Sequence, residues 1–325
     1  MSLRAGLIGV GNMGKNHLRV LRNLNGVDLV GIYDTNTKLS LADSNVGISN
    51  EFKDFLDLNL DYAVVAVPTI YHEEFALLLA EEGIHAFIEK PISHDLTSAI
   101  RIRDVFKSEN LIGAVGHIER FNPAVIEAKK RLSEVGNIYQ ILTRREGPFP
   151  GRISDVGVIR DLASHDIDIT EWISNQSFVT IYAQTAFKSG RPNEDLMIAM
   201  ATLDKGAKSN HIVNWLSPKK SRSIVILGEN GTFEIDTLNA DLTFFKNGTI
   251  KNMWDEISYF RGVSEGDSVR YAIEKKEPLV REHENFRDAI LGNSNEIVTF
   301  DEGVRVLEVA EAISKSAKDN IVVSI

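Results

Sequence analysis

Three glycines near the start of the chain have the spacing of a phosphate-binding turn. Residues 9–14 read Gly-Val-Gly-Asn-Met-Gly, directly after an apolar run and at the start of a helical pattern. Glycine permits a tight turn and the close approach of a pyrophosphate, and a helix N-terminus offers N–H groups to its oxygens. The motif predicts a dinucleotide site; an ordinary tight turn is the alternative.

Asp34 indicates which dinucleotide this site would take. It lies about 20 residues after Gly14, at the end of the second predicted strand, where a carboxylate hydrogen-bonds the ribose diol. The same negative charge repels a 2′-phosphate. We therefore expect NAD rather than NADP, although Lys38 nearby keeps NADP open as the less favoured cofactor.

Residues 161–168, Asp-Leu-Ala-Ser-His-Asp-Ile-Asp, form the densest polar cluster. On a helix Asp161 and His165 share a face, and Asp168 follows one turn later. A carboxylate beside an imidazole suits general-base catalysis, because it stabilises the imidazolium that forms after proton abstraction. The alternatives are a solvated helix start capped by Asp161 and a metal site. The other histidines show no ligand spacing, so no metal is expected.

Glu89-Lys90-Pro91 follows a short predicted strand. In a parallel sheet the carboxyl end of a strand is the edge at which ligands bind. A lysine there can donate a hydrogen bond to a substrate hydroxyl and stabilise a developing alkoxide. A surface lysine in a loop is the alternative.

Residues 116–123, Gly-His-Ile-Glu-Arg-Phe-Asn-Pro, connect the last strand of this first region to the next helix. This position is a domain junction, where clefts are common. Arg120 can pair there with an anionic group such as a diphosphate. A salt bridge between the domains is the equally favoured alternative.

The first third of the chain alternates between strand and helix patterns. Strand-like runs cover 3–10, 27–33, 61–67, 85–88 and 111–116, and helical periodicity covers 13–24, 73–82 and 95–108, the last capped by Asp95. Such alternation with continuous apolar strands is typical of a parallel sheet covered on both faces. We expect an α/β, doubly wound nucleotide-binding domain over residues 1–122.

The pattern changes after residue 135. Strand-like segments at 137–145, 178–187, 195–203, 208–216, 222–228, 231–236 and 241–246 are separated by turns instead of crossover helices. Helices are expected near 161–174, 282–291 and 302–317. Strands joined only by turns pair mostly antiparallel. We expect an α+β domain with an open, mostly antiparallel sheet over residues 123–325.

Composition excludes several classes of protein. The chain has 325 residues, no cysteine and a formal net charge of −10. Disulfides and thiolate metal sites are therefore excluded, and nonspecific binding to nucleic acid or to anionic membranes is not expected. No apolar run reaches the roughly 20 residues that span a bilayer, and the start does not read as a signal peptide. A cytoplasmic protein is expected.

These motifs together resemble the glucose–fructose oxidoreductase/inositol dehydrogenase (Gfo/Idh/MocA) family over essentially the whole chain. The resemblance implies an N-terminal Rossmann domain and a C-terminal domain for substrate binding and oligomerisation. It implies that the catalytic residues are Lys90, Asp161 and His165. It implies that the cofactor is bound by Gly9, Gly11, Asn12, Met13, Gly14, Asp34, Val67, Pro68, Thr69, His72, Glu89 and Lys90. Substrate is expected at Lys90, Glu119, Arg120, Asn122, Asp161 and His165.

Residues 116–123, 152–159 and 161–168 resemble the branch of the family that includes UDP-N-acetylglucosamine 3-dehydrogenases. This implies oxidation of the 3-hydroxyl of UDP-N-acetylglucosamine to a 3-keto sugar. His165 would act as the base and Lys90 would hold the oxygen, and the exchange of these two roles fits equally well. An inositol or free-sugar dehydrogenase is the alternative enzyme. A non-catalytic nucleotide-sensing regulator is the alternative of another class.

Self-association is also expected. Strand 178–187 alternates so that its two faces would carry Phe178, Thr180, Tyr182 and Gln184 on one side and Val179, Ile181 and Ala183 on the other. Few helices follow this sheet, so one face would stay open, and an open apolar face commonly marks an interface. The resemblance also implies dimers or tetramers. We predict a homodimer or homotetramer formed through the sheet at 178–246.

Overall fold

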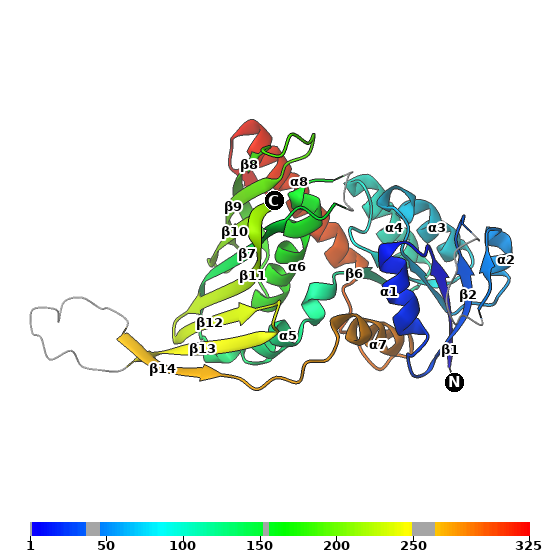
Figure 1. Ribbon diagram of the computed structural model, residues 1–325, viewed down its shortest axis with the longest axis horizontal. Helices are drawn as coiled ribbons and strands as arrows, with labels where there is room; N and C mark the ends of the chain where they lie inside the picture. Colours follow the sequence, from blue (N-terminus) through cyan, green and yellow to red (C-terminus); the bar gives the residue numbers. More distant parts are fainter. Residues whose placement is uncertain (1, 37–45, 152–155, 249–263) are drawn as a thin grey trace, which may run out of the picture. The chain divides into compact units, whose positions relative to one another are not determined.

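The computed structural model describes residues 2–36, 46–151, 156–248 and 264–325 (Figure 1). Lys38 and Arg152, which entered the cofactor and subfamily predictions, lie outside the described residues. The chain divides into two compact units. The first comprises Met1–Phe121 and Lys276–Glu308, and the second comprises Asn122–Lys275 and Val309–Ile325.

The first unit is built on a parallel sheet, as predicted. Among the described residues it has six strands in the order β3-β2-β1-β4-β5-β6, and every described pair is parallel. The strands are β1 (Leu3–Ile8), β2 (Val27–Tyr33), β3 (Ile48–Ser49), β4 (Tyr62–Val65), β5 (His85–Glu89) and β6 (Gly113–Gly116). The helices are α1 (Asn12–Leu21), α2 (Phe52–Leu56), α3 (His72–Glu81), α4 (Leu96–Ser108) and α7 (Pro278–Ile290).

Successive residues of each strand point into two different cores. On β4, Ala63 and Val65 pack with residues of α3 and α4, whereas Tyr62 and Val64 pack with residues of α1 and α7. The sheet is therefore covered on both faces, which confirms the doubly wound Rossmann arrangement. The Asp95 carboxylate accepts a hydrogen bond from the Ser98 N–H at 2.8 Å, so the predicted cap of α4 is also confirmed.

Helix α7 belongs to a different unit from the one to which the predicted boundary at residue 123 assigned it. The prediction assigned everything after that residue to one domain, but Lys276–Glu308 belongs to the first unit. The physical reason is apolar burial. Phe286 is fully buried on α7, and its ring packs edge-on against Tyr62 and Phe87 of the parallel sheet.

The second unit contains the open antiparallel sheet. In the described part of the chain its nine strands follow the order β14-β13-β12-β11-β7-β10-β9-β8-β15, and β7–β10 is the one parallel pair. The strands are β7 (Ile138–Pro148), β8 (Phe178–Ala186), β9 (Leu196–Leu203), β10 (Lys208–Asn214), β11 (Leu216–Gly228), β12 (Gly231–Asp236), β13 (Asp241–Gly248), β14 (Ser264–Arg270) and β15 (Val323–Ser324).

Helices cover one face of this sheet. They are α5 (Pro123–Lys130), α6 (Ser164–Ser174) and the end of α8 (Phe300–Asp319). Helix α5 contacts β12 and β13, helix α6 contacts β7, and Ser316 of α8 accepts a hydrogen bond from the Ala183 N–H of β8 at 2.9 Å. Along β7 the buried residues Ile141, Thr143 and Arg145 alternate with more exposed neighbours, as expected when one face is covered.

A buried ion pair joins α6 to β7. The Arg145 Nε donates to Asp166 Oδ1 at 2.9 Å, and both side chains are almost fully buried. Arg144, the preceding residue, points to the other face, where its side chain is 53% exposed and pairs with Glu146. The two arginines therefore offer a matched comparison of a buried and an exposed ion pair.

We expect Arg145→Gln to lower the free energy of unfolding of the second unit by about 3–5 kcal/mol, because the Asp166 charge stays buried without its partner. Arg144→Gln should cost about 0–1 kcal/mol, as is usual for an exposed pair. Trp172 and Trp215 are the tryptophans among the described residues, and both fall within the second unit, so their fluorescence during urea unfolding reports this unit. Equal costs for the two substitutions would contradict the argument.

Candidate active site

The glycine turn between β1 and α1 has the geometry of a dinucleotide-binding turn. Gly9 has a φ of +89°, and a Cβ at this position would lie 2.8 Å from the Ala66 carbonyl oxygen. A Cβ on Gly14 would lie 2.1 Å from the Gly9 oxygen, so the third glycine lets α1 start against the turn. A Cβ on Gly11 would meet nothing within 4 Å. The open space beside Gly11 leaves room for a pyrophosphate.

The first turn of α1 also fits a phosphate. Gly11 precedes the helix without any side-chain cap, no acidic residue occupies the first turn, and Asn12 is exposed. The N–H groups at this helix start point away from the helix body and carry the positive end of its dipole. Met13, the other predicted contact in this turn, is half-buried.

Asp34 lies at the end of β2 and is tied to the glycine turn. Its Oδ2 accepts a hydrogen bond from the Val10 N–H at 2.7 Å, and its Oδ1 accepts one from the Asn36 N–H at 2.8 Å. Each carboxylate oxygen has a further lone pair, so these bonds orient Asp34 and leave acceptor capacity for two ribose hydroxyls. The half-buried side chain therefore fits the predicted role.

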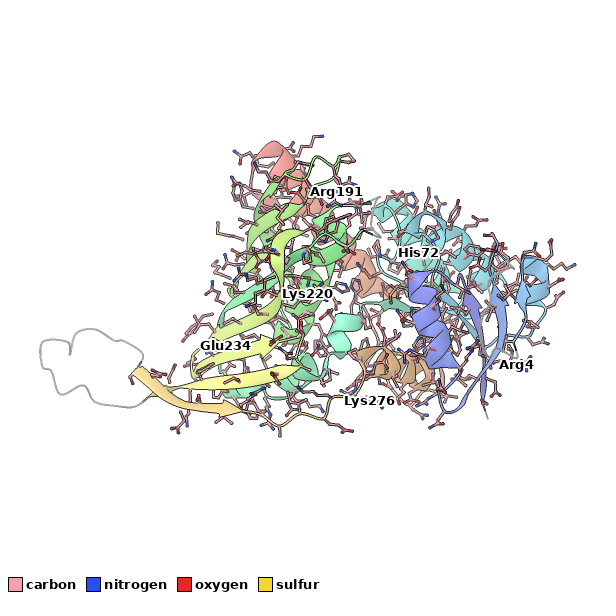
Figure 2. All side chains as sticks on the ribbon, in the orientation of Figure 1. Arg4, His72, Arg191, Lys220, Glu234 and Lys276 are labelled. Atoms are coloured by element: carbon pink, nitrogen blue, oxygen red, sulfur yellow. The ribbon has the colours of Figure 1, made fainter. Side chains whose placement is uncertain are left out.

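The loop after β4 is braced by His72, which is labelled in Figure 2. Its Nε2 lies 3.0 Å from the Val67 carbonyl oxygen, and its Nδ1 lies 3.0 Å from the Pro91 carbonyl oxygen. Both ring nitrogens face protein atoms, and burial lowers the pKa of this imidazole despite these backbone contacts. His72 thus connects the loops that follow β4 and β5. Of the other predicted contacts, Pro68 is exposed and Thr69 is half-buried.

Glu89 and Lys90 follow one another at the carboxyl end of β5. The Glu89 Oε2 accepts a hydrogen bond from the Lys90 N–H at 3.1 Å, and its Oε1 lies 2.8 Å from His17 Nε2. Burial would raise the pKa of Glu89, but the hydrogen bond and charge of His17 and the charge of Lys90 lower it below its usual value. A negative charge is therefore held at the ligand edge of the sheet. Lys90 precedes a cis peptide bond to Pro91.

The Asp161–His165 segment of the second unit begins with a π-helical turn, Ile159–Ala163, and continues into α6. Asp161 and His165 are half-buried, whereas Asp166 and Asp168 are buried. The cluster thus divides into two partly accessible residues and two interior ones. Asp166 serves the ion pair with Arg145. Irregular turns of this kind are frequent at functional sites.

Glu194 holds the start of this turn and was missed by sequence analysis. Its Oε1 accepts a hydrogen bond from the Ile159 N–H at 3.1 Å, and its carbonyl accepts one from Val158 at 3.1 Å. A Cβ on Gly157 would lie 2.0 Å from Glu194 Oε1, so the carboxylate occupies the space that a side chain would take here. Gly157 and Glu194 are 37 residues apart in the sequence, and no spacing pattern links them.

Two predicted substrate residues make hydrogen bonds or ion pairs within the protein. Arg120 is 5% exposed, and its Nη1 donates to Glu302 Oε1 at 2.7 Å. Both residues belong to the first unit, so this ion pair is not the predicted link between domains. Asn122 caps α5 by accepting from the Ala124 N–H at 3.0 Å and donates to the Thr237 carbonyl at 2.9 Å. Both ends of its amide thus contact the protein, and Glu119, the other predicted substrate residue of this motif, is half-buried.

Across the described ranges, no group of three or more His, Cys, Asp or Glu side chains has an arrangement that could hold a metal ion. Within the same ranges, no helix has the length and apolar character needed to cross a membrane.

Comparison with known proteins finds similar sequences and similar folds over most of the chain. UDP-N-acetylglucosamine 3-dehydrogenase of Acidithiobacillus ferrooxidans is 26% identical over 315 residues, which is 95% of each chain. Its solved structure covers 98% of this chain and 99% of its own, with a TM-score of 0.85 and 24% identity. Inositol 2-dehydrogenase 2 of Saccharopolyspora erythraea is 29% identical over 206 residues, 60% of each chain.

A further solved structure has the same fold. The WlbA dehydrogenase of Bordetella pertussis, in complex with NADH and UDP-GlcNAcA, matches with a TM-score of 0.84 and 22% identity, covering 100% of this chain and 98% of its own. The family model for an oxidoreductase family with an NAD-binding Rossmann fold matches residues 3–117, and the GFO/IDH/MocA C-terminal domain matches residues 127–234. Because these models account in turn for the parallel sheet and for most of the antiparallel sheet, the chain belongs to the Gfo/Idh/MocA family of NAD-binding oxidoreductases.

Proposed function

We propose that this protein oxidises the 3-hydroxyl of UDP-N-acetylglucosamine to a 3-keto sugar with NAD. The protein is an NAD-dependent dehydrogenase acting on CH–OH groups by its family. The observation that carries the substrate assignment is the match to UDP-N-acetylglucosamine 3-dehydrogenase, which extends over 95% of both chains. The inositol dehydrogenase relative covers 60% of each chain, so it supports inositol oxidation as the second candidate.

The proposed cofactor site uses the glycine turn and Asp34. The space beside Gly11 and the start of α1 take the pyrophosphate, and the Asp34 carboxylate takes the ribose diol. Bound NAD supplies the acceptor for the hydride that leaves the sugar carbon. The loop braced by His72 and the end of β5 then border the reacting end of the cofactor.

The proposed chemistry uses three side chains of this protein. Lys90 donates to the reacting hydroxyl and stabilises the negative charge that develops on its oxygen. His165 takes the hydroxyl proton, and Asp161 stabilises the imidazolium that results. The reverse assignment, with Lys90 as the base, needs the same three residues. A nucleotide-sensing regulator would need none of them, and their presence together favours an enzyme.

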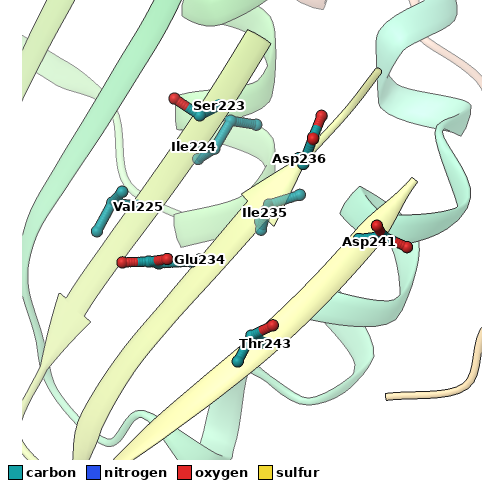
Figure 3. A pocket seen from close by; sticks show the side chains of 8 residues that line it. All are labelled: Ser223, Ile224, Val225, Glu234, Ile235, Asp236, Asp241 and Thr243. Atoms are coloured by element: carbon teal, nitrogen blue, oxygen red, sulfur yellow. The ribbon is translucent and has the colours of Figure 1, made fainter. Parts of the chain in front are cut away.

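We also propose that the open face of the second sheet forms a homodimer, or a tetramer of such dimers. Ile198 and Met200 of β9 are 48% and 55% exposed on this face. Ile212 pairs with Ile198, and Val225 pairs with Leu142, so aliphatic residues continue across neighbouring strands. At the β11–β13 end lies a hollow of about 320 Å³. Five polar residues border it together with three aliphatic ones (Figure 3): Ser223, Glu234, Asp236, Asp241 and Thr243, and Ile224, Val225 and Ile235. A mixed face of this kind fits a specific contact between like surfaces.

Cofactor preference tests the Asp34 assignment. The wild-type protein should bind NAD about tenfold to a hundredfold more tightly than NADP, because a hydrogen bond to a charged group is worth about 1.5–3 kcal/mol. Asp34→Asn should narrow this ratio, whereas Asp28→Asn, an exposed residue on the same strand, should leave it unchanged. Fluorescence titration with both cofactors measures the ratio. Equal or tighter NADP binding by the wild type would refute the assignment.

Turnover tests the substrate and the catalytic residues together. With NAD and a panel of UDP-sugars, free sugars and inositols, we expect NADH absorbance to rise fastest with UDP-N-acetylglucosamine. Lys90→Ala and His165→Ala should each lower turnover by about 10² or more, the usual scale for a positioned acid or base. Lys53→Ala, an exposed lysine of α2, is the control. Faster reduction with an inositol would select the second candidate, and near-wild-type turnover in both variants would overturn the proposed chemistry.

Light scattering tests self-association. Tyr182 is half-buried and donates to Asn320 Oδ1 at 2.5 Å, so Met200, which pairs with it across β8 and β9, is the better probe. The wild type should have at least twice its chain mass of 36.2 kDa at micromolar concentration. Met200→Asp should shift it to the monomer, because a carboxylate would be buried in the contact. Leu291→Asp, on an exposed leucine of the first unit, is the control, and a monomeric wild type would exclude the dimer.

A further inference from the structure

A continuous chain of buried polar side chains runs behind Lys90 in the first unit. The His17 Nε2 lies 2.8 Å from Glu89 Oε1, and the His17 Nδ1 lies 2.8 Å from His283 Nε2. Both histidines are 0% exposed. The three residues come from α1, β5 and α7, and His17 and His283 are 266 residues apart in sequence. Neither histidine has a role in the chemistry proposed above.

The distances fix how the protons can be arranged. A carboxylate only accepts, so His17 must present its Nε2–H to Glu89. With neutral His17, its Nδ1 accepts from His283 Nε2–H; with charged His17, the direction of this second bond reverses. In either case the donor to Glu89 is kept. Burial and the charge of His17 lower the pKa of His283 well below its usual value, so the two rings do not both carry a charge.

The packing around the chain holds it in place. The Phe87 ring stacks on His283 with a centroid distance of 5.1 Å and meets His17 edge-on at 5.5 Å. On the other side, a Cβ on Gly116 would lie 3.3 Å from Glu89 Oε1, so the absence of a side chain there lets β6 approach the carboxylate. The Glu89 carboxylate therefore has a fixed position, from which its second oxygen accepts the Lys90 N–H.

We propose that His17 and His283 are positioning residues for Lys90: they hold the Glu89 carboxylate in place and charged, and this carboxylate anchors the Lys90 backbone at the end of β5. The inference rests on the proposed role of Lys90 in the reaction. His17 also lies on α1, one turn after Gly14 of the glycine turn. The same ring thus links the helix that begins at the cofactor to the strand that carries Lys90.

The proposal makes a statement about pH. The groups that act on the Glu89 carboxyl are His17 from α1, Lys90 beside it and His72 from α3, while His283 from α7 acts through His17. Because His17 and Lys90 lower the pKa of Glu89, the carboxylate persists to a lower pH than that of an ordinary glutamate. Without His17, only Lys90 offsets the effect of burial, so the pKa of Glu89 rises. The carboxylate, and the activity that depends on it, is then lost at a higher pH.

The test compares His17→Leu with His17→Gln in the full-length protein. With saturating NAD and the preferred substrate, His17→Leu should lower kcat by about 10- to 100-fold, the effect of a misplaced reacting group. The acid limb of its kcat–pH profile should begin at a higher pH than in the wild type. His17→Gln keeps an N–H near the Nε2 position, and should recover most of kcat and return the limb toward the wild-type pH. NAD affinity, from fluorescence titration, should change by less than about threefold in both.

Two further variants keep the test decisive. Glu89→Gln keeps the shape without the charge, and should have a low kcat with no acid limb from this residue. His283→Leu should move the limb in the same direction as His17→Leu, whereas Arg19→Gln, an exposed residue of α1, should not move it. If both leucine variants have the wild-type kcat and the wild-type acid limb of the kcat–pH profile, the inference is wrong. It is also wrong if kcat falls only in proportion to a loss of NAD affinity and the acid limb does not move. Near-wild-type turnover of Lys90→Ala would instead overturn the proposed function.

Discussion

Burial of Phe286 between Tyr62 and Phe87 is the contact on which the rest of the first unit depends. It keeps α7 against the parallel sheet, although α7 follows the whole antiparallel sheet in the chain. With α7 in place, His283 reaches His17, and His17 reaches Glu89. This apolar contact therefore helps to determine the position of the buried Glu89 carboxylate at the end of β5. Removing that contact would expose part of the core on one face of the sheet and take His283 away from His17.

Local patterns predicted the parts of the fold that depend on local chemistry. The strand 27–33, the cap at Asp95 and the glycine turn follow from β-propensity, side-chain capping and backbone freedom, and the structure has all three. Features that depend on non-local packing were not predicted from the sequence. The alternation predicted for strand 178–187 breaks at a register shift between Phe178 and Thr180, so that Phe178 is buried together with Ile181. No periodicity indicates such a shift, since it arises from the pairing with β9.

Residue type limits what a sequence can say about a site residue. Asp34, placed at the end of β2, can act as a hydrogen-bond acceptor, and the structure shows such a bond from the Val10 N–H of the glycine turn. Arg120 and Asn122 read equally well as ligand groups, yet the fold uses them for an ion pair with Glu302 and for a helix cap. His17 and Glu194 carry no motif at all. Their partners are distant in sequence, so only the folded chain shows what they hold.

The split of the first unit has a consequence for how the protein is made. A ribosome delivers residues from the N-terminus, so the parallel sheet emerges long before Lys276–Glu308. Until then α7 is missing, and the side of the sheet that carries Tyr62 and Phe87 is covered by α1 without α7. The second unit is synthesised during this interval and can assemble much of its own sheet. The nucleotide-binding unit begins first in the sequence, yet it can be completed only after most of the second unit has been synthesised.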